Sequence, residues 1–166
     1  LTARSIIIAT GAEPLVPAIP GLAEAGYLTS DTLWGLRERP ERLVVLGGGP
    51  IGCELAQSFQ RLGSQVTQVE MQSRLMSRED PEFSDRVAAR FRADGVDLRL
   101  DTRALEVIQV DNEKRLRVSC NGQVQEIAFD AILVAVGRKA RLQGFGLERL
   151  GIATGQTIEV DEYLRT

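Results

Sequence analysis

The chain has 166 residues, of which 43% are apolar, and this is enough for one hydrophobic core of ordinary domain size. Its 20 basic and 23 acidic residues give a net charge of −3 with no basic patch, which argues against nucleic acid or a membrane as partners. There is no histidine, so the commonest general acid or base near neutral pH and the commonest metal ligand are both missing.

The first predicted element is a buried strand over Arg4–Ala9, because this run is apolar and β-branched. It is far shorter than the roughly 20 residues that cross a bilayer, and no signal peptide precedes it, so we expect a soluble cytoplasmic protein. The prolines that follow Thr10-Gly11 predict an extended connection. A short helix is expected to begin after Ser30 or Asp31 and to stop before Pro40.

The strongest pattern follows. Leu43–Leu46 is apolar without alternation, which is typical of a central parallel strand covered on both faces. A helix is expected from Pro50, whose missing N–H costs nothing in a first turn, to Gly63. Gln65–Glu70 is predicted to be the next strand. The face of the helix that meets the core is expected to carry the apolar side chains at helical spacing, which are Ile51, Leu55, Phe59 and Leu62.

A second helix is expected over Pro81–Ala93, with Phe83, Val87 and Phe91 on one face and the arginines facing solvent. Asp97–Asp101 would then be the third parallel strand and would complete a βαβαβ pattern.

The periodicity changes to alternation between Leu105 and Phe129, with turn signals at Asp111-Asn112 and Asn121-Gly122. This pattern predicts a β-meander. Ala131–Ala135 is again an unbroken apolar strand, and one short strand is expected in the tail around Ile158–Val160. The predicted fold class is therefore α/β, a Rossmann-like parallel sheet with a β-meander.

A glycine-rich turn joins the first predicted parallel strand to its helix. Gly47 would permit the tight turn, Gly49 would let a pyrophosphate approach the backbone, and Gly52 would let the helix pack closely on the strand. The N–H groups and the positive dipole end of the helix would then face the phosphates. Glu70, 23 residues after Gly47, ends the next strand, where it would accept hydrogen bonds from the adenosine ribose. Its charge would repel a 2′-phosphate, so NAD is preferred over NADP.

One other class uses a similar turn. Methyltransferases that bind S-adenosylmethionine also combine a glycine-rich turn with an acidic strand end. The full three-glycine spacing and the meander count against that interpretation. The two cysteines, Cys53 and Cys120, are too few and too far apart for a CxxC pair or a zinc site, and we expect two thiols that are not bonded to each other.

Beyond the glycines, the sequence resembles the flavoprotein disulfide reductases, the family of dihydrolipoamide dehydrogenase, glutathione reductase and mercuric reductase. Ala9–Pro14 resembles the ATG segment on which the family's FAD domain ends, and Pro40–Glu70 resembles its NAD-binding unit. Ala135–Arg138 resembles the segment that returns to the FAD domain, and Val160–Thr166 the stretch before a second FAD motif.

The resemblance implies a domain organisation. Residues 1–35 would be the edge of an FAD domain with its connection, 36–143 the NAD-binding domain, and 144–166 the return segment. Since the chain also begins without methionine, we expect a part of a longer enzyme that is not active by itself. Its partners would be a dinucleotide and the parent's FAD and dimer domains, and the parent would be a homodimer.

The resemblance also implies roles for single residues. Glu54 would lie near the nicotinamide and pair with a lysine of the FAD domain, and Met71 stands where NADP-using relatives tend to carry an arginine. Arg74 and Arg78 lie nearby and are expected to face solvent. No catalytic or metal-binding residue is expected. The residues expected to bind cofactor are Thr10, Gly11, Gly47, Gly49, Pro50, Ile51, Gly52, Glu54, Glu70, Met71, Ala135, Val136 and Gly137.

Three departures separate the chain from parts of the family. Pro50 stands where glutathione reductases carry a gating tyrosine, and Ala140-Arg141 replaces the usual Pro-Asn. The redox cysteine pair and the histidine-bearing dimer domain are absent. Two further functions therefore stay open: an NADH oxidase or ferredoxin reductase-type flavoprotein, and a non-catalytic module that senses NAD. Thr10-Gly11 argues against the sensor, which has no use for the edge of an FAD domain.

Overall fold

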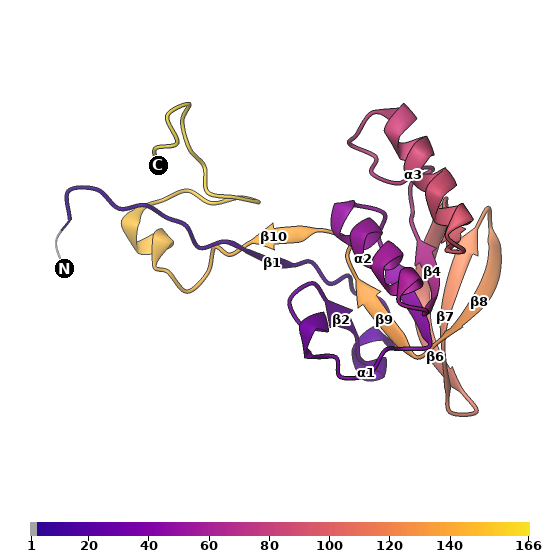
Figure 1. The fold of residues 1–166 in the computed structure, drawn as a ribbon. Coiled ribbons are helices and arrows are strands. Elements are labelled where there is room, and N and C mark those ends of the chain that lie inside the picture. The colour runs from indigo at the N-terminus through magenta and orange to yellow at the C-terminus, as the bar shows by residue number, and fades with distance from the viewer. Residues whose placement is uncertain (1–2) are drawn as a thin grey trace. The chain divides into compact units, whose positions relative to one another are not determined.

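The structure is a computed structural model that describes residues 3–166, and these residues form two compact units (Figure 1). The larger unit is Pro14–Gly137, and the smaller one combines the residues up to Glu13 with Arg138–Thr166. Nowhere in the described part of the chain is there a helix with the length and apolar character needed to span a membrane.

The larger unit is built on a five-stranded parallel sheet in the order β2-β9-β3-β4-β5. The central strand pairs with both neighbours, so that Val45 lies beside Gln68 on one side and Leu133 on the other. This confirms the predicted central parallel strand. In sheet order the bounds are Leu28–Thr29 (β2), Ala131–Val134 (β9), Arg42–Leu46 (β3), Gln65–Val69 (β4) and Asp97–Arg99 (β5).

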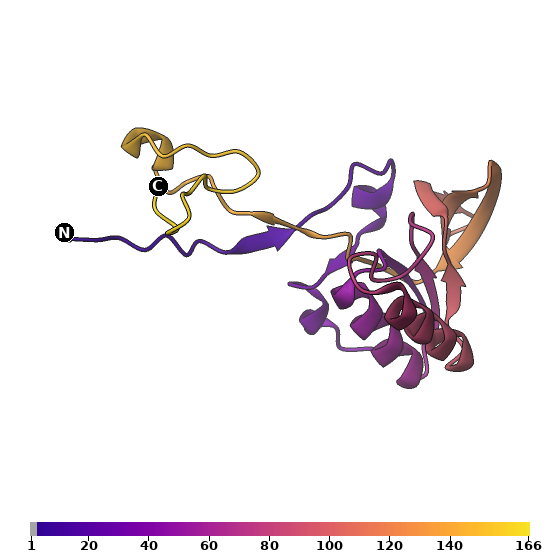
Figure 2. The ribbon, with the colours of Figure 1, turned by 90° about the horizontal axis from the view of Figure 1, so that it is seen from above.

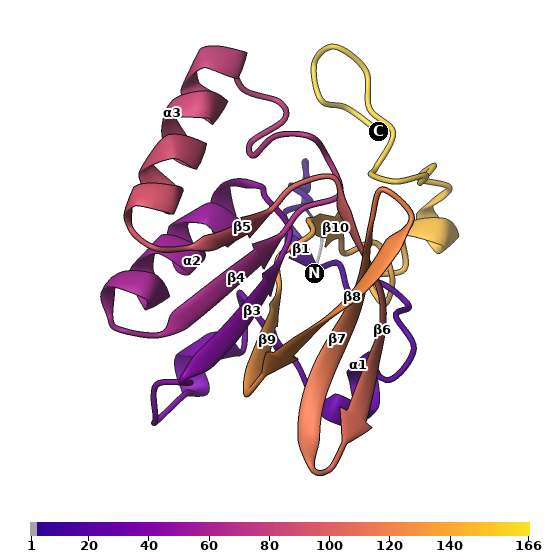
Figure 3. The same cartoon turned by 90° about the vertical axis from the view of Figure 1, so that its right-hand side faces the viewer.

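Two helices cover one face of this sheet and lie side by side, as Figures 2 and 3 show. They are α2 (Pro50–Arg61) and α3 (Pro81–Ala93), and both begin with the predicted proline. The Asp80 side chain caps α3 by accepting a hydrogen bond from the Glu82 N–H at 3.0 Å. Asp94 then joins the two helices, because Gln57, Arg61 and Arg90 all donate to its carboxylate.

The β-meander covers the other face of the sheet (Figure 3). Its antiparallel strands are β6 (Thr102–Val110), β7 (Glu113–Cys120) and β8 (Gln123–Phe129). The predicted turns are confirmed at both connections, where Asp111, Asn112 and Asn121 have positive φ. A short helix, α1 (Leu22–Ala25), packs against β6.

The sheet therefore lies between two cores. One core faces the helices and includes Leu43, Val45, Cys53, Ala56 and Phe91. The other faces the meander and includes Val44, Leu46, Leu116, Phe129 and Ile132. Neighbouring β3 residues alternate between the two cores, which explains why the strand is apolar throughout.

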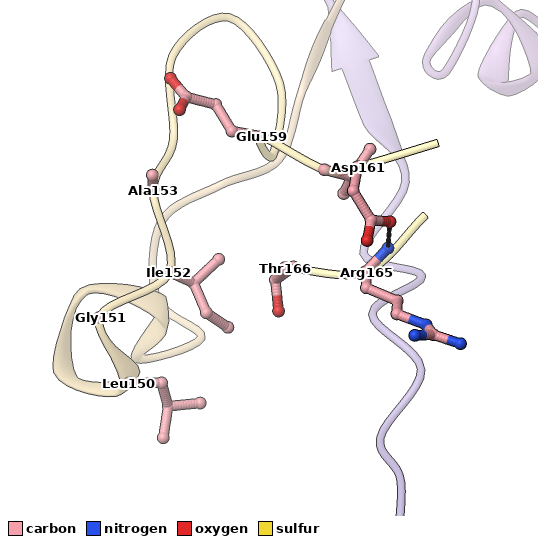
Figure 4. Close-up of a pocket in the computed structure, with 9 residues that line it drawn as sticks. Leu150, Gly151, Ile152, Ala153, Glu159, Asp161, Arg165 and Thr166 are labelled. Carbon is pink, nitrogen blue, oxygen red and sulfur yellow. Dashed lines mark hydrogen bonds between the residues drawn. The ribbon is translucent and has the colours of Figure 1, made fainter. Parts of the chain in front are cut away.

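The smaller unit has much less regular structure. It contains a two-stranded sheet of β1 (Ala12–Pro14) with β10 (Arg138–Ala140), and a 3-10 helix over Leu147–Leu150. Its C-terminal part lines an open hollow of about 530 Å³, in which the Arg165 N–H donates to the Asp161 carboxylate at 2.9 Å (Figure 4).

Two predicted strands are wrong. Arg4–Ala9 contains no strand, and its Ile6 and Ile7 side chains are 78% and 90% exposed. An apolar run forms a strand only where a neighbouring strand accepts its hydrogen bonds, and no strand of the described residues does so here. The tail has an isolated bridge between Thr154 and Ile158 where a strand over Ile158–Val160 was expected.

The helix expected after Ser30 is reduced to a 3-10 helix over Leu33–Gly35. The Thr32 hydroxyl accepts a hydrogen bond from the Thr29 N–H at 2.9 Å, and such local side-chain bonds compete with a regular helix. The segment is also too short to offset the cost of nucleating a longer helix.

The predicted buried faces of both helices need correction. The fully buried residues of α2 are Gly52, Cys53 and Ala56, while Leu62 beyond its end is 68% exposed. The helix lies so close to the sheet that only small side chains fit directly between them. Leu55 and Phe59 therefore pack at the margin of the core. On α3, Phe91 is buried but Phe83 is 61% exposed.

Candidate functional site

The glycine-rich turn brings three backbone segments into contact at the carboxyl end of β3. Gly47 has φ +107°, and a Cβ atom there would lie 2.4 Å from the Ala135 carbonyl oxygen. A Cβ on Gly52 would lie 2.3 Å from the Gly47 carbonyl oxygen. Both positions therefore require glycine, because any side chain would push β9 or α2 away from the turn.

Gly49 differs from the other two glycines. A Cβ atom there would have no heavy atom within 4 Å, and none of the hydrogen bonds in the described part of the chain uses its N–H. Gly49 is the N-cap of α2, and no side chain caps this helix end. The first turn of α2 thus presents free N–H groups and the positive dipole end to open space. This arrangement suits an anion such as phosphate.

Glu70 follows β4 and holds the turn from the side. One carboxylate oxygen accepts a hydrogen bond from the Gly48 N–H, and the other accepts from the Gln72 N–H at 2.7 Å. Each carboxylate oxygen has a second lone-pair site, so the group can still accept hydrogen bonds from a ligand. The carboxylate is therefore fixed in position and still has acceptor capacity.

The loop beyond Glu70 shows how the nearby cations lie. Met71 is 63% exposed. Arg74 is half-buried and donates to the Ser77 carbonyl at 2.7 Å, whereas Arg78 is exposed. The Met76 N–H donates to the Gly48 carbonyl at 2.7 Å, so this loop closes back onto the glycine turn.

Two buried side chains lie beneath the turn, and the sequence analysis did not single them out for this role. The Gln68 Nε2 donates to the Gly47 carbonyl at 3.0 Å and lies 3.7 Å from the Cys53 sulfur. The Cys53 thiol donates to the Gly48 carbonyl at 3.4 Å. Burial raises the pKa of the Cys53 thiol to about 11, so the group is neutral at pH 7.

The buried Gln68 side chain lowers the stability of the fold. Its side chain is fully buried, and its Oε1 has no hydrogen-bond partner in the described structure. An unpaired buried acceptor costs about 1–3 kcal/mol. The sequence signal was an amide in the middle of the predicted strand Gln65–Glu70, two residues before Glu70.

The segment after β9 completes the site. The Ala135 N–H donates to the Leu46 carbonyl at 2.8 Å, which places Ala135 beside the turn. Val136 is 41% exposed, and Gly137 has φ +136°. The carboxyl ends of β3, β4 and β9 therefore meet at one edge of the sheet, where ligands bind in open α/β sheets.

Most of the predicted site residues come together in the larger unit. Glu54 is exposed on α2, and its carboxylate makes no hydrogen bond or ion pair with any described residue. Thr10 and Gly11 belong to the smaller unit, where the Thr10 hydroxyl donates to the Arg141 carbonyl at 2.7 Å and the Gly11 carbonyl accepts from the Arg141 N–H. Around the turn lie Gly47, Gly49, Pro50, Ile51, Gly52, Glu70, Ala135 and Val136.

A second hollow lies between α2 and α3 and measures about 320 Å³. Cys53, Met76, Val87 and Phe91 line it, and Arg86 and Arg90 at its rim already pair with Glu82 and Asp94. Residues 3–166 contain no group of three or more acidic, cysteine or histidine side chains that could hold a metal ion.

Comparison with known proteins shows which family the chain is similar to. The family model described as pyridine nucleotide-disulphide oxidoreductase matches residues 1–166. A mercuric reductase of Streptomyces lividans is 43% identical over 99% of this chain and 35% of its own length. A mercuric reductase of Staphylococcus aureus is 40% identical over the whole chain and 31% of its own length. A dihydrolipoyl dehydrogenase of Chlamydia trachomatis is 33% identical and is covered to 36%.

Solved structures agree with this. The HOCl-induced flavoprotein disulfide reductase RclA from Escherichia coli has a TM-score of 0.85 and 35% identity over 95% of this chain and 36% of its own. An engineered water-forming NADPH oxidase has a TM-score of 0.75 at 22% identity over 87% of this chain and 32% of its own, which shows the fold alone. The chain thus spans about a third of the length of the relatives it matches.

Proposed function

The chain belongs to the pyridine nucleotide-disulphide oxidoreductase family, and from that premise we propose that its larger unit binds NAD(H) for hydride exchange with FAD in a longer enzyme. One observation carries the proposal. The open Gly49 N–H lies at the start of α2. In the same turn, the Gly48 N–H donates a hydrogen bond to the Glu70 carboxylate. An N–H that can donate to a phosphate and a carboxylate that can accept from a ribose are thereby held together.

Each residue has a defined task in this proposal. The Gly49 N–H and the first turn of α2, with Pro50 and Ile51, bind the pyrophosphate. Glu70 accepts hydrogen bonds from the adenosine ribose, and the backbone of Ala135, Val136 and Gly137 lies along the cofactor. Glu54, whose carboxylate is exposed on the first turns of α2, lies near the nicotinamide. When bound, the dinucleotide supplies or accepts the hydride.

We propose the following organisation for the parent enzyme. Residues 36–143 form the NAD-binding domain, and residues 1–35 and 144–166 belong with an FAD domain. Thr10 and Gly11 are then cofactor-binding residues on the FAD side. The parent is a cytoplasmic homodimer that passes electrons to a disulfide or a related acceptor. The relatives named mercuric reductase, dihydrolipoyl dehydrogenase and flavoprotein disulfide reductase support this branch over an oxidase or a sensor.

NADH should bind more tightly than NADPH. The Glu70 carboxylate is held in place by two backbone N–H groups, so it cannot easily turn away from a 2′-phosphate. Arg74, a cation of the loop after Glu70, donates a hydrogen bond to the Ser77 carbonyl at 2.7 Å. We expect at least a tenfold preference for NADH, about 1.4 kcal/mol, in calorimetric titrations of the chain with both cofactors.

Two variants sharpen this test. Glu70→Gln removes the charge and should narrow the preference, whereas Glu79→Gln, an exposed carboxylate in the same loop, should leave it unchanged. Equal affinity for the two cofactors, or tighter binding of NADPH by the wild-type chain, would mean that Glu70 does not select the dinucleotide.

A further inference from the structure

The peptide unit between Gly47 and Gly48 is held by a hydrogen bond at its carbonyl and another at its N–H. Its carbonyl accepts a hydrogen bond from Gln68 Nε2 at 3.0 Å, and its N–H donates to the Glu70 carboxylate. Gln68 belongs to β4 and Glu70 follows the last residue of that strand, so one short stretch of backbone supplies both contacts. A planar peptide unit held on opposite sides in this way cannot rotate without breaking one of the bonds.

The next peptide, between Gly48 and Gly49, depends on the first. Its carbonyl accepts from the Met76 N–H at 2.7 Å and from the Cys53 thiol at 3.4 Å. In a trans peptide the C=O and N–H point in opposite directions. The Gly49 N–H is therefore directed away from these donors, and a Cβ at Gly49 would have no heavy atom within 4 Å.

Gln68 is the part of this arrangement that packing does not explain. An apolar side chain of the same size would fill the site without leaving a buried oxygen unpaired, as Gln68 Oε1 is. The useful half of the amide is thus Nε2, which contacts the Gly47 carbonyl and the Cys53 sulfur. Both contacts stabilise the turn, and neither is available to a ligand.

We propose that Gln68 is a positioning residue for the phosphate cradle, which presets the Gly47–Gly49 backbone so that the Gly49 N–H faces the pyrophosphate. The proposal rests on the dinucleotide-binding function proposed above. It makes Gln68 a determinant of dinucleotide affinity that does not touch the dinucleotide. Pre-organisation of this kind raises affinity because less ordering is required on binding.

Gln68→Met is the test variant, since methionine is close in size and cannot donate a hydrogen bond. Ser64→Ala is the matched control. Ser64 is also buried, comes just before the same strand, and donates to the Pro40 carbonyl at 2.7 Å, at the opposite end of β4 from the turn. Each variant of the 166-residue chain is compared with wild type by ¹⁵N NMR without ligand, by calorimetric titration with NADH, and by thermal unfolding.

We expect Gln68→Met to move the Gly48 and Gly49 amide resonances and to raise the NADH dissociation constant about tenfold. Ser64→Ala should change neither readout, although it lowers the unfolding midpoint. The proposal would be overturned if the Gly48 and Gly49 resonances did not move in Gln68→Met. It would also be overturned if Gln68→Met lost no more NADH affinity than Ser64→Ala does at the same drop in unfolding midpoint. If Gln68→Met does not fold, Gln68→Leu is measured in the same way.

The two proposals fail differently. Absence of NADH binding by the folded wild-type chain would overturn the proposal that this unit binds a dinucleotide. The proposed effect of Gln68 on dinucleotide affinity would fall at the same time. The glycine resonances would then still decide whether Gln68 presets the turn. Normal NADH binding by both wild type and Gln68→Met would leave the proposed function intact and refute the positioning role.

Discussion

Two short apolar runs, Leu43–Leu46 in the larger unit and Ile6–Ala9 in the smaller, have similar composition and opposite surroundings. All four residues of the first run are at most 3% exposed, whereas Ile6 and Ile7 are 78% and 90% exposed. The first run has β4 and β9 as hydrogen-bonded neighbours and a core on each face. A strand therefore depends on what lies beside it at least as much as on its own residues.

The contrast extends to the two units as wholes. The larger unit contains both hydrophobic cores, and Leu147 is the single buried apolar side chain among the described residues of the smaller unit. Burial of apolar surface is the main favourable term in folding. The larger unit thus has the means to hold its own fold and its glycine turn, while the smaller unit has few such contacts.

The largest expected effect tests this contrast directly. Phe129→Ala removes a fully buried ring between the sheet and the meander and should lower the free energy of unfolding by about 3–5 kcal/mol. Ile7→Ala, in the smaller unit, should change it by less than about 0.5 kcal/mol. Urea unfolding followed by circular dichroism measures both. A comparable loss from Ile7→Ala would show that the exposed run has partners in solution.

A second pair of variants compares close packing in the two units. Gly52→Ala would place its Cβ 2.3 Å from the Gly47 carbonyl oxygen, so α2 must move and the turn with it. We expect a loss of about 1–3 kcal/mol in stability and at least tenfold weaker NADH binding. Gly155→Ala, in the smaller unit, meets its nearest atom at 3.8 Å and should alter neither property. If Gly52→Ala binds NADH normally, the turn does not require close contact with the helix.

The sequence alone was sufficient where the signals are local. Proline at the start of each helix, the glycine spacing and the Asn121-Gly122 turn led directly to α2, α3 and the meander. The glycine spacing also singled out Glu70, whose carboxylate accepts a hydrogen bond from the Gly48 N–H, while its role as a ribose acceptor stays a prediction.

Features that depend on distant parts of the chain were not predictable. β2 is two residues long and exists because Leu28 and Thr29 pair with β9, more than a hundred residues later. The insertion of β9 between β2 and β3 has no local periodicity. The role of Gln68 depends on the Gly47 carbonyl, 21 residues earlier in the chain, and on Cys53 of helix α2. The exposure of Ile6 and Ile7 follows from missing neighbours, which their own composition does not reveal.

The smallest expected effect asks whether the core of the larger unit also protects the groups beneath its turn. Cys53 is buried there, and burial raises its pKa from 9.0 to about 11, while Cys120 at the end of β7 is only half-buried. A raised pKa means that the Cys53 thiol contributes its full stabilisation of the folded state below pH 9, and that this contribution is lost as the pH rises toward 11.

At pH 8, Ellman's reagent should therefore label Cys120 rapidly and Cys53 only as the chain unfolds, with two free thiols after denaturation without reductant. Cys53→Ala should remove the slow phase and make the unfolding midpoint less sensitive to pH between 9 and 11, whereas Cys120→Ala should remove the fast phase alone. Equal labelling rates in the native chain, or no free thiol after denaturation, would show that the core does not shield Cys53 or that the two cysteines are bonded.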